Sequence, residues 1–162
     1  MELTVWGAAE QVTGSMHLLE FDNYKILIDC GLDYERDTYQ EENQNFPFDP
    51  TTLDLVVLTH AHIDHTGNLP TLVRMGFQGQ VLCTPATADL TEILLMDAVN
   101  IFLSKQKKSG RGRGRRQQSS GPPPLYLQKH VNDTLERFVT IGFHKQFQFH
   151  DKAAITFIPV GH

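Results

Sequence analysis

The sequence has 162 residues, enough for one domain, and 40% of them are hydrophobic, which is normal for a globular protein and argues against a disordered chain. Its net charge of −5 at pH 7 excludes nucleic-acid binding through an overall positive charge. The charge is uneven, because residues 1–104 hold 16 of the 19 acidic side chains, whereas residues 105–116 hold seven Lys or Arg and no acid. This contrast predicts either a local contact with a polyanion or a solvated loop.

The first residues predict a soluble protein that is not secreted. They begin with a short strand-like run at 3–6 instead of a basic segment followed by a long apolar one, and no stretch of the sequence is long enough to span a bilayer. Cys30 and Cys83 each lie in an apolar strand-like run, which favours buried reduced thiols over a disulfide framework. We therefore expect a cytoplasmic protein with no membrane contact.

The first sixty residues predict strands. Short apolar runs at 3–6, 16–21 and 25–30 are separated by turns, and Asp22-Asn23 between the last two is typical of a hairpin. An antiparallel meander is the simplest arrangement of these three strands. Residues 32–50 are polar and acidic and lack periodicity, so they predict a long surface loop of the kind that often borders a functional site.

The middle of the chain alternates strands and helices. Residues 55–59 are a continuous apolar run, typical of a strand buried on both faces, and residues 67–75 predict a short helix. Residues 80–84 predict another buried strand. Thr84-Pro85 then begins a helix with apolar positions from Leu90 to Phe102. This alternation predicts an α/β fold.

The composition of residues 105–124 predicts a flexible basic insertion, because the segment contains almost nothing that a core could bury. A second helix is predicted at 126–139, followed by strands at 143–149 and 154–160. The sequence then ends with Gly161-His162, directly after the last predicted strand.

A histidine-rich cluster follows the buried strand at 55–59. His60 and His62 are two residues apart in extended backbone, so both imidazoles can point to the same side and share one metal ion. Asp64 and His65 follow after the chain has begun to turn, and they point to a neighbouring position. This suits two cations about 3.5–4 Å apart. Imidazole and carboxylate ligands without a nearby thiolate favour zinc, with manganese or iron as substitutes.

These residues resemble a known family. The run T-H-A-H-I-D-H-T-G-N-L-P at 59–70, together with I-D-C-G at 28–31, resembles the metallo-β-lactamase superfamily. The opening G-A-A-E-Q-V-T-G-S at 7–15 narrows the resemblance to its β-CASP branch of RNA-processing nucleases, which includes RNase J and the endonuclease of the eukaryotic cleavage and polyadenylation machinery. The resemblance runs from residue 3 to residue 162. It implies the N-terminal half of an αββα sandwich, with a mixed β-sheet and two or three helices on its outer face.

The resemblance also implies roles for individual residues. Five metal ligands are implied, three on a first metal and two on a second: His60, His62 and His162, and then Asp64 and His65. Asp29 is implied to orient the histidine loop, and it forms with Asp64 the predicted pair of catalytic carboxylates. The family supplies a bridging Asp, a further His and the β-CASP insertion from later sequence, so we expect residues 1–162 to be an incomplete domain that binds one metal well.

The leading hypothesis is a zinc-dependent phosphodiester hydrolase, a ribonuclease of RNA processing, of which this chain is a weakly active or inactive part. Its substrate would be single-stranded RNA. A thioester or small-ester hydrolase of the same superfamily would use the same histidines, and a non-catalytic metal-binding or RNA-binding module would use no catalytic group. The inner face of the predicted sheet would stay exposed without a second half, which predicts self-association or a missing C-terminal half.

Several residues keep a plainer interpretation. His162 could be a frayed terminal residue, and Asp29 could cap a turn before Gly31. The basic residues of the insertion either contact RNA phosphates or belong to a solvated loop. They are Lys105, Lys107, Lys108, Arg111, Arg113, Arg115 and Arg116. The remaining histidines lie on ordinary strand or helix faces and are excluded from the site: His17, His130, His144 and His150.

Overall fold

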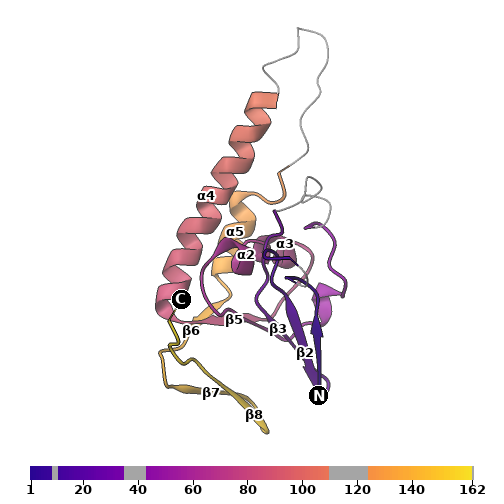
Figure 1. The fold of residues 1–162 in the computed structure, drawn as a ribbon, viewed down its shortest axis with the longest axis vertical. Helices are drawn as coiled ribbons and strands as arrows, with labels where there is room; N and C mark the ends of the chain where they lie inside the picture. The colour runs from indigo at the N-terminus through magenta and orange to yellow at the C-terminus, as the bar shows by residue number, and fades with distance from the viewer. Residues whose placement is uncertain (9–10, 35–42, 110–123, 162) are drawn as a thin grey trace.

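The computed structural model of the chain describes residues 1–8, 11–34, 43–109 and 124–161 (Figure 1). The secondary structure elements in these ranges are, in chain order, β1 (Glu2–Val5), β2 (His17–Phe21), β3 (Tyr24–Ile28), η1 (Pro50–Thr52), β4 (Leu55–Val57), α2 (Ile63–Thr66), α3 (Leu69–Arg74), β5 (Gln80–Cys83), α4 (Pro85–Ser109), α5 (Gln128–Leu135), β6 (Phe138–Thr140), β7 (Gln146–His150) and β8 (Ala153–Thr156).

Strands β1 to β6 form one mixed sheet in sequence order. The first three strands are antiparallel, and β3 to β6 are parallel to one another. Asp22 and Asn23 connect β2 to β3 with φ angles of 44° and 67°, the left-handed backbone that a two-residue hairpin turn needs. The predicted meander and the mixed α/β sheet are therefore confirmed.

The two faces of this sheet are covered by different layers. Side chains alternate between the faces along each strand, so neighbouring residues enter different cores. On the face toward the helices, Leu27, Val56 and Val81 of the sheet form a buried core with residues of α3. The opposite face is buried against the hairpin of β7 and β8 and includes Ile26, Leu55 and Leu82. The strands of the parallel part are thus apolar on both faces, as their unbroken hydrophobic sequence predicts.

The β7–β8 hairpin lies across the sheet from the helices (Figure 1). An aromatic cluster attaches its tip, because Phe149 contacts Phe21 and Tyr24 with ring centroids 5.9 and 5.8 Å apart. Lys152 adds an ion pair to Asp22 at 2.7 Å. A largely apolar cavity of about 480 Å³ remains between the hairpin and the sheet. The hairpin therefore covers only part of the inner face. Self-association or a missing half stays a prediction.

Two of the sequence-based boundaries that are wrong concern helices. Helix α4 continues to Ser109, five residues into the segment predicted to be a flexible insertion from residue 105. Lys and Gln have high helix propensity, which favours continuation of the helix through this polar run. Residues 110–123 of the insertion lie outside the described residues. The helix predicted at 126–139 ends at Leu135, because residues 138–140 pair with β5 as strand β6. No helix among the described ranges is long and apolar enough to cross a membrane.

Phe149→Ala tests how the hairpin is attached. Aromatic pairs contribute about 0.5–1.5 kcal/mol beyond the burial of their area, so we expect amide protons of β7 and β8 to exchange about tenfold faster or more. The amides of β3 to β5 should keep their protection. Hydrogen exchange followed by NMR measures both. Phe143→Ala is the matched control, since Phe143 is 49% exposed and precedes the hairpin. Unchanged protection of the hairpin in Phe149→Ala would contradict the assignment of this cluster.

Candidate metal centre

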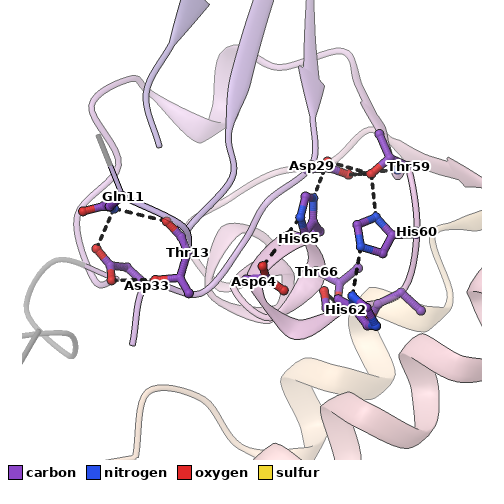
Figure 2. A network of polar contacts seen from close by, with 11 residues as sticks. Gln11, Thr13, Asp29, Asp33, Thr59, His60, His62, Asp64, His65 and Thr66 are labelled. Carbon is purple, nitrogen blue, oxygen red and sulfur yellow. Dashed lines mark hydrogen bonds and ion pairs between the residues drawn. The ribbon is translucent and has the colours of Figure 1, made fainter. Parts of the chain in front are cut away.

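The topology brings the ends of β3 and β4 to the same edge of the sheet. The strands are parallel neighbours, so the residues that follow them lie side by side, and the backbone N–H of Asp29 donates to the carbonyl of Val57 at 2.9 Å. The histidine cluster occupies the loop after β4 and the short helix α2. Asp29 thus lies beside the cluster although it is some thirty residues earlier in the chain (Figure 2).

Asp29 is the buried polar centre of this region. Its side chain accepts from the backbone N–H of Thr59 at 2.8 Å and from the Thr59 hydroxyl at 3.0 and 2.8 Å, one distance to each carboxylate oxygen. It also contacts Nδ1 of His65 at 2.8 Å. The residue is 2% exposed and has a φ of 61°, a left-handed conformation that Asp tolerates better than most residues. A buried carboxylate costs little free energy only when its oxygens are bonded in this way.

The contact with Asp29 decides which nitrogen of His65 is free to bind a metal. A carboxylate only accepts hydrogen bonds, so the proton lies on Nδ1 and the lone pair on Nε2. Nε2 lies 3.6 Å from a carboxylate oxygen of Asp64. Nitrogen and oxygen ligands thus face a common space.

His60 and His62 face each other on the other side of the loop. Nε2 of His60 and Nδ1 of His62 are 3.1 Å apart, and Nδ1 of His60 contacts the hydroxyl of Thr59 at 3.0 Å. Two nitrogen ligands of one tetrahedral zinc are about 3.3 Å apart, given Zn–N distances of about 2.0–2.1 Å. The pair therefore fits a shared metal in both chemistry and spacing. The His60 and His65 rings are also adjacent, with centroids 4.1 Å apart.

Close backbone packing holds the loop in place. The N–H groups of Ser15 and Cys30 donate to the carbonyls of Asp64 and His65 at 2.9 and 2.7 Å. Gly31 passes so close that an added Cβ would lie 1.7 Å from the carbonyl oxygen of Asp64. The Gly-rich opening and the residues after β3 thus form one wall against α2.

The thiol of Cys30 does not join the ligand set. It is fully buried, and burial, followed by the neighbouring Asp29 carboxylate, raises the pKa of this thiol well above its ordinary value. A neutral buried thiol is a packing group, since metals bind the thiolate. The expectation that Cys30 is a packing residue agrees with its place in the core.

The structure brings together five predicted site residues: Asp29, His60, His62, Asp64 and His65. His162 lies outside the described residues, but Gly161 before it lines the same groove as His60 and His62. Among the residues that the structure describes, no three His, Cys, Asp or Glu side chains form a complete metal-holding group. The site is thus two pairs of candidate ligands, with Asp29 in contact with His65 and with Thr59, the neighbour of His60.

Two of the excluded histidines have contacts away from the site. The ring of His150 lies against Phe21 and Tyr24 in the aromatic cluster. Nδ1 of His130 accepts from the N–H of Leu127 at 3.1 Å at the start of α5. Burial is the main cause that lowers the pKa of His130, and a neutral ring keeps this acceptor.

The groove beside the histidine pair has a volume of about 480 Å³ and is mostly apolar. Thr59, His60 and His62 line one side of it. Leu90 at the start of α4 and Phe143 before β7 line the others. No Lys, Arg, Asp or Glu among the described residues lines this groove, so any charge on a ligand there would have to be met by a metal or the histidines.

Two groups of polar contacts near the site were not predicted from the sequence. Thr59 contacts both Asp29 and His60, and the only sequence signal for it is a hydroxyl residue directly before the first histidine. A second cluster secures the Gly-rich opening, where Asp33 accepts from Thr13 at 3.1 Å and from Gln11 at 2.9 Å (Figure 2). Such contacts between distant segments leave no periodic pattern in a sequence.

Comparison with known proteins gives consistent matches. Residues 10–154 match the Metallo-beta-lactamase superfamily. Ribonuclease TTHA0252 of Thermus thermophilus is 45% identical over 102 residues, which are 63% of this chain and 23% of that protein. The transcription termination factor FttA is 36% identical in Methanosarcina mazei (67% of this chain, 17% of that protein) and 29% identical in Methanothermobacter thermautotrophicus (99% and 23%). The chain spans about a fifth of the length of these relatives.

Gly31→Ala tests the packing of the histidine loop. Its Cβ would meet the carbonyl oxygen of Asp64 at 1.7 Å and the backbone nitrogen of Ser15 at 2.7 Å, so two backbone segments would have to separate. We expect the free energy of unfolding in urea to fall by about 3 kcal/mol or more. Gly142→Ala is the control, because the nearest atoms to its Cβ are side-chain carbons of Lys145 at 3.8 Å. Equal stability of the two variants would show that the loop can move without cost.

Proposed function

The chain belongs to the metallo-beta-lactamase superfamily, and we propose that it is the metal-binding part of a β-CASP ribonuclease that hydrolyses phosphodiester bonds of single-stranded RNA. The observation that carries this proposal is the pair of ligand sets after β4, supported from behind by Asp29. The similarity to a protein named as a ribonuclease supports the nucleic-acid substrate. The G-A-A-E-Q-V-T-G-S opening supports the β-CASP assignment.

The proposed metal is zinc, with manganese or iron as substitutes, because the ligands are imidazoles and a carboxylate. His60 and His62 would hold a first ion with His162, and Asp64 and His65 a second ion that further ligands would complete. When bound, zinc supplies positive charge that polarises the scissile phosphate and makes water a stronger nucleophile. The chain by itself would hold one ion well.

The chain's own residues supply orientation. Asp29 keeps the proton of His65 on Nδ1, so Nε2 points toward Asp64 and the metal space. Asp64 adds negative charge beside this nitrogen. The groove along the histidine pair would receive the nucleotide, whose bases can contact Phe143 and Leu90. Asp29 is therefore proposed as a positioning carboxylate and Asp64 as a metal ligand of the catalytic centre.

The basic insertion is proposed to contact RNA phosphates, because Lys and Arg there could release counterions from the substrate. It carries the seven cations of residues 105–116, which begin at the C-terminal end of helix α4, whereas the first turns of this helix line the groove. We also propose a cytoplasmic location, which the two buried free thiols, Cys30 and Cys83, support.

A second candidate is a thioester or small-ester hydrolase of the same superfamily. The apolar lining of the groove favours it, since an acyl chain would bury against Leu90, Phe143 and Ile158. A metal-binding module without catalysis is the third candidate.

Metal content tests the ligand assignment. The wild-type chain loaded with zinc and desalted should retain about one ion by mass spectrometry, and His62→Ala should lose most of it because the first site keeps too few imidazoles. His144→Asn is the matched control, since this residue has a φ of 61° that Asn also adopts and does not itself line the groove. Unchanged zinc stoichiometry in His62→Ala would rule out this site.

Substrate choice separates the three candidates. The zinc-loaded chain should cleave a labelled single-stranded RNA slowly, and a chelator or His62→Ala should abolish the cleavage. A thioester substrate should stay intact. Hydrolysis of the thioester with intact RNA would instead favour the small-ester enzyme. Zinc binding with neither reaction would favour the non-catalytic module.

A further inference from the structure

We infer that Thr59 is a positioning residue that connects Asp29 to His60, so that one buried carboxylate fixes the ring of a predicted ligand in each of the two metal sites. The inference rests on the proposed metal centre and adds a residue that the ligand pattern does not contain. Figure 2 shows the continuous series of contacts from His65 through Asp29 and Thr59 to His60 and His62.

The proton positions along this series follow from the chemistry of its members. The Thr59 hydroxyl has one proton, and both oxygens of Asp29 lie within 3.0 Å of it as acceptors. The hydroxyl therefore donates to Asp29. Its oxygen is then left to accept from His60, whose Nδ1 lies 3.0 Å away. The proton of neutral His60 is thus placed on Nδ1 and its lone pair on Nε2.

The same carboxylate assigns the proton of His65. One oxygen of Asp29 accepts both from the Thr59 hydroxyl at 2.8 Å and from Nδ1 of His65 at 2.8 Å. Each ring therefore carries its proton on Nδ1 and its lone pair on Nε2, His65 by direct contact with Asp29 and His60 through Thr59. Fixing the tautomer and the ring angle before the metal arrives lowers the entropy cost of binding.

His62 differs from the other two histidines. Its Nδ1 faces the lone pair of His60 Nε2 at 3.1 Å, so without a metal it carries the proton of that hydrogen bond. Metal binding through both nitrogens requires this proton to leave Nδ1, whereas His60 and His65 need no such change. The contact with Thr59 thus fixes the tautomer of His60, and His62 is the residue whose tautomer changes when a metal binds.

Thr59 can be tested without damage to the core. It is an exposed residue, and its backbone N–H bond to Asp29 does not depend on the side chain. Thr59→Val keeps the shape and removes the hydroxyl, while Thr59→Ser keeps the hydroxyl. Thr51→Val is the matched control, because the exposed Thr51 hydroxyl also donates to a carboxylate, Asp49, at 2.7 Å in the 3-10 helix away from the site.

The first readout needs no metal. Long-range ¹H–¹⁵N NMR of the histidine rings should show His60 in the Nδ1–H form in the wild type, in Thr59→Ser and in Thr51→Val. It should show a shift toward Nε2–H in Thr59→Val. Retention of the Nδ1–H form in Thr59→Val would overturn the inference. Should Thr59→Val not fold by circular dichroism, Thr59→Ala removes the same hydroxyl and carries the same expectation.

The second readout is zinc affinity measured by competition with a chromophoric chelator. Loss of a hydrogen-bond partner behind a metal ligand typically weakens affinity about 10–100-fold, and we expect a loss of that size in Thr59→Val. Thr59→Ser and Thr51→Val should stay within about threefold of the wild type. Equal affinity of Thr59→Val and wild type would overturn the role of Thr59. Absence of zinc binding in the wild type would instead overturn the proposed metal centre, while the NMR result would still decide the relay.

Discussion

The buried carboxylate of Asp29 is the interaction on which the rest of the site depends. Asp29 directly follows β3, accepts hydrogen bonds from the backbone N–H and the hydroxyl of Thr59 after β4, and contacts Nδ1 of His65 in α2. The Asp29 side chain is 2% exposed, and a buried carboxylate is stable only when hydrogen-bond donors surround it. Removal of any one donor would therefore raise the free energy of the folded state. Because Thr59 and His65 must both donate to Asp29, the histidine loop is held in one arrangement.

The fold supplies the conditions for this arrangement. Parallel β3 and β4 place their carboxyl ends together, and the core on the helix side sets the position of the α2–α3 segment. The hairpin of β7 and β8 covers the opposite face and then leads the chain back to the groove, where residues 158–161 lie across from His60 and His62. The layers therefore bring residues from the middle and from the C-terminal part of the chain to one groove.

The site is asymmetric in how well this chain prepares it. The space beside His60 and His62 has two facing nitrogens, whereas the space beside Asp64 and His65 has one nitrogen and one carboxylate 3.6 Å apart. A four-coordinate ion needs further ligands at either place. The matched segments cover only about a fifth of each of these relatives, so most of each relative has no counterpart in this chain.

The sequence by itself determined the superfamily, the alternation of strands and helices and the place of the His-Asp cluster after a buried strand. Local spacing carries this information, because His60 and His62 can share a side only in extended backbone, and a continuous apolar run such as residues 55–59 favours a strand buried on both faces. The role of Asp29 was predicted only from the family resemblance, because the neighbouring sequence does not distinguish it from an ordinary turn residue.

Tertiary structure alone decided the rest. The contacts of Asp29 with Thr59 and His65 and the close approach of Gly31 to Asp64 join residues thirty or more positions apart, so they have no local signature. The end of α5 was also decided in three dimensions, because residues 138–140 pair with β5 in preference to extending the helix. Long-range pairing overrides local propensity wherever a strand position is open at the edge of a sheet.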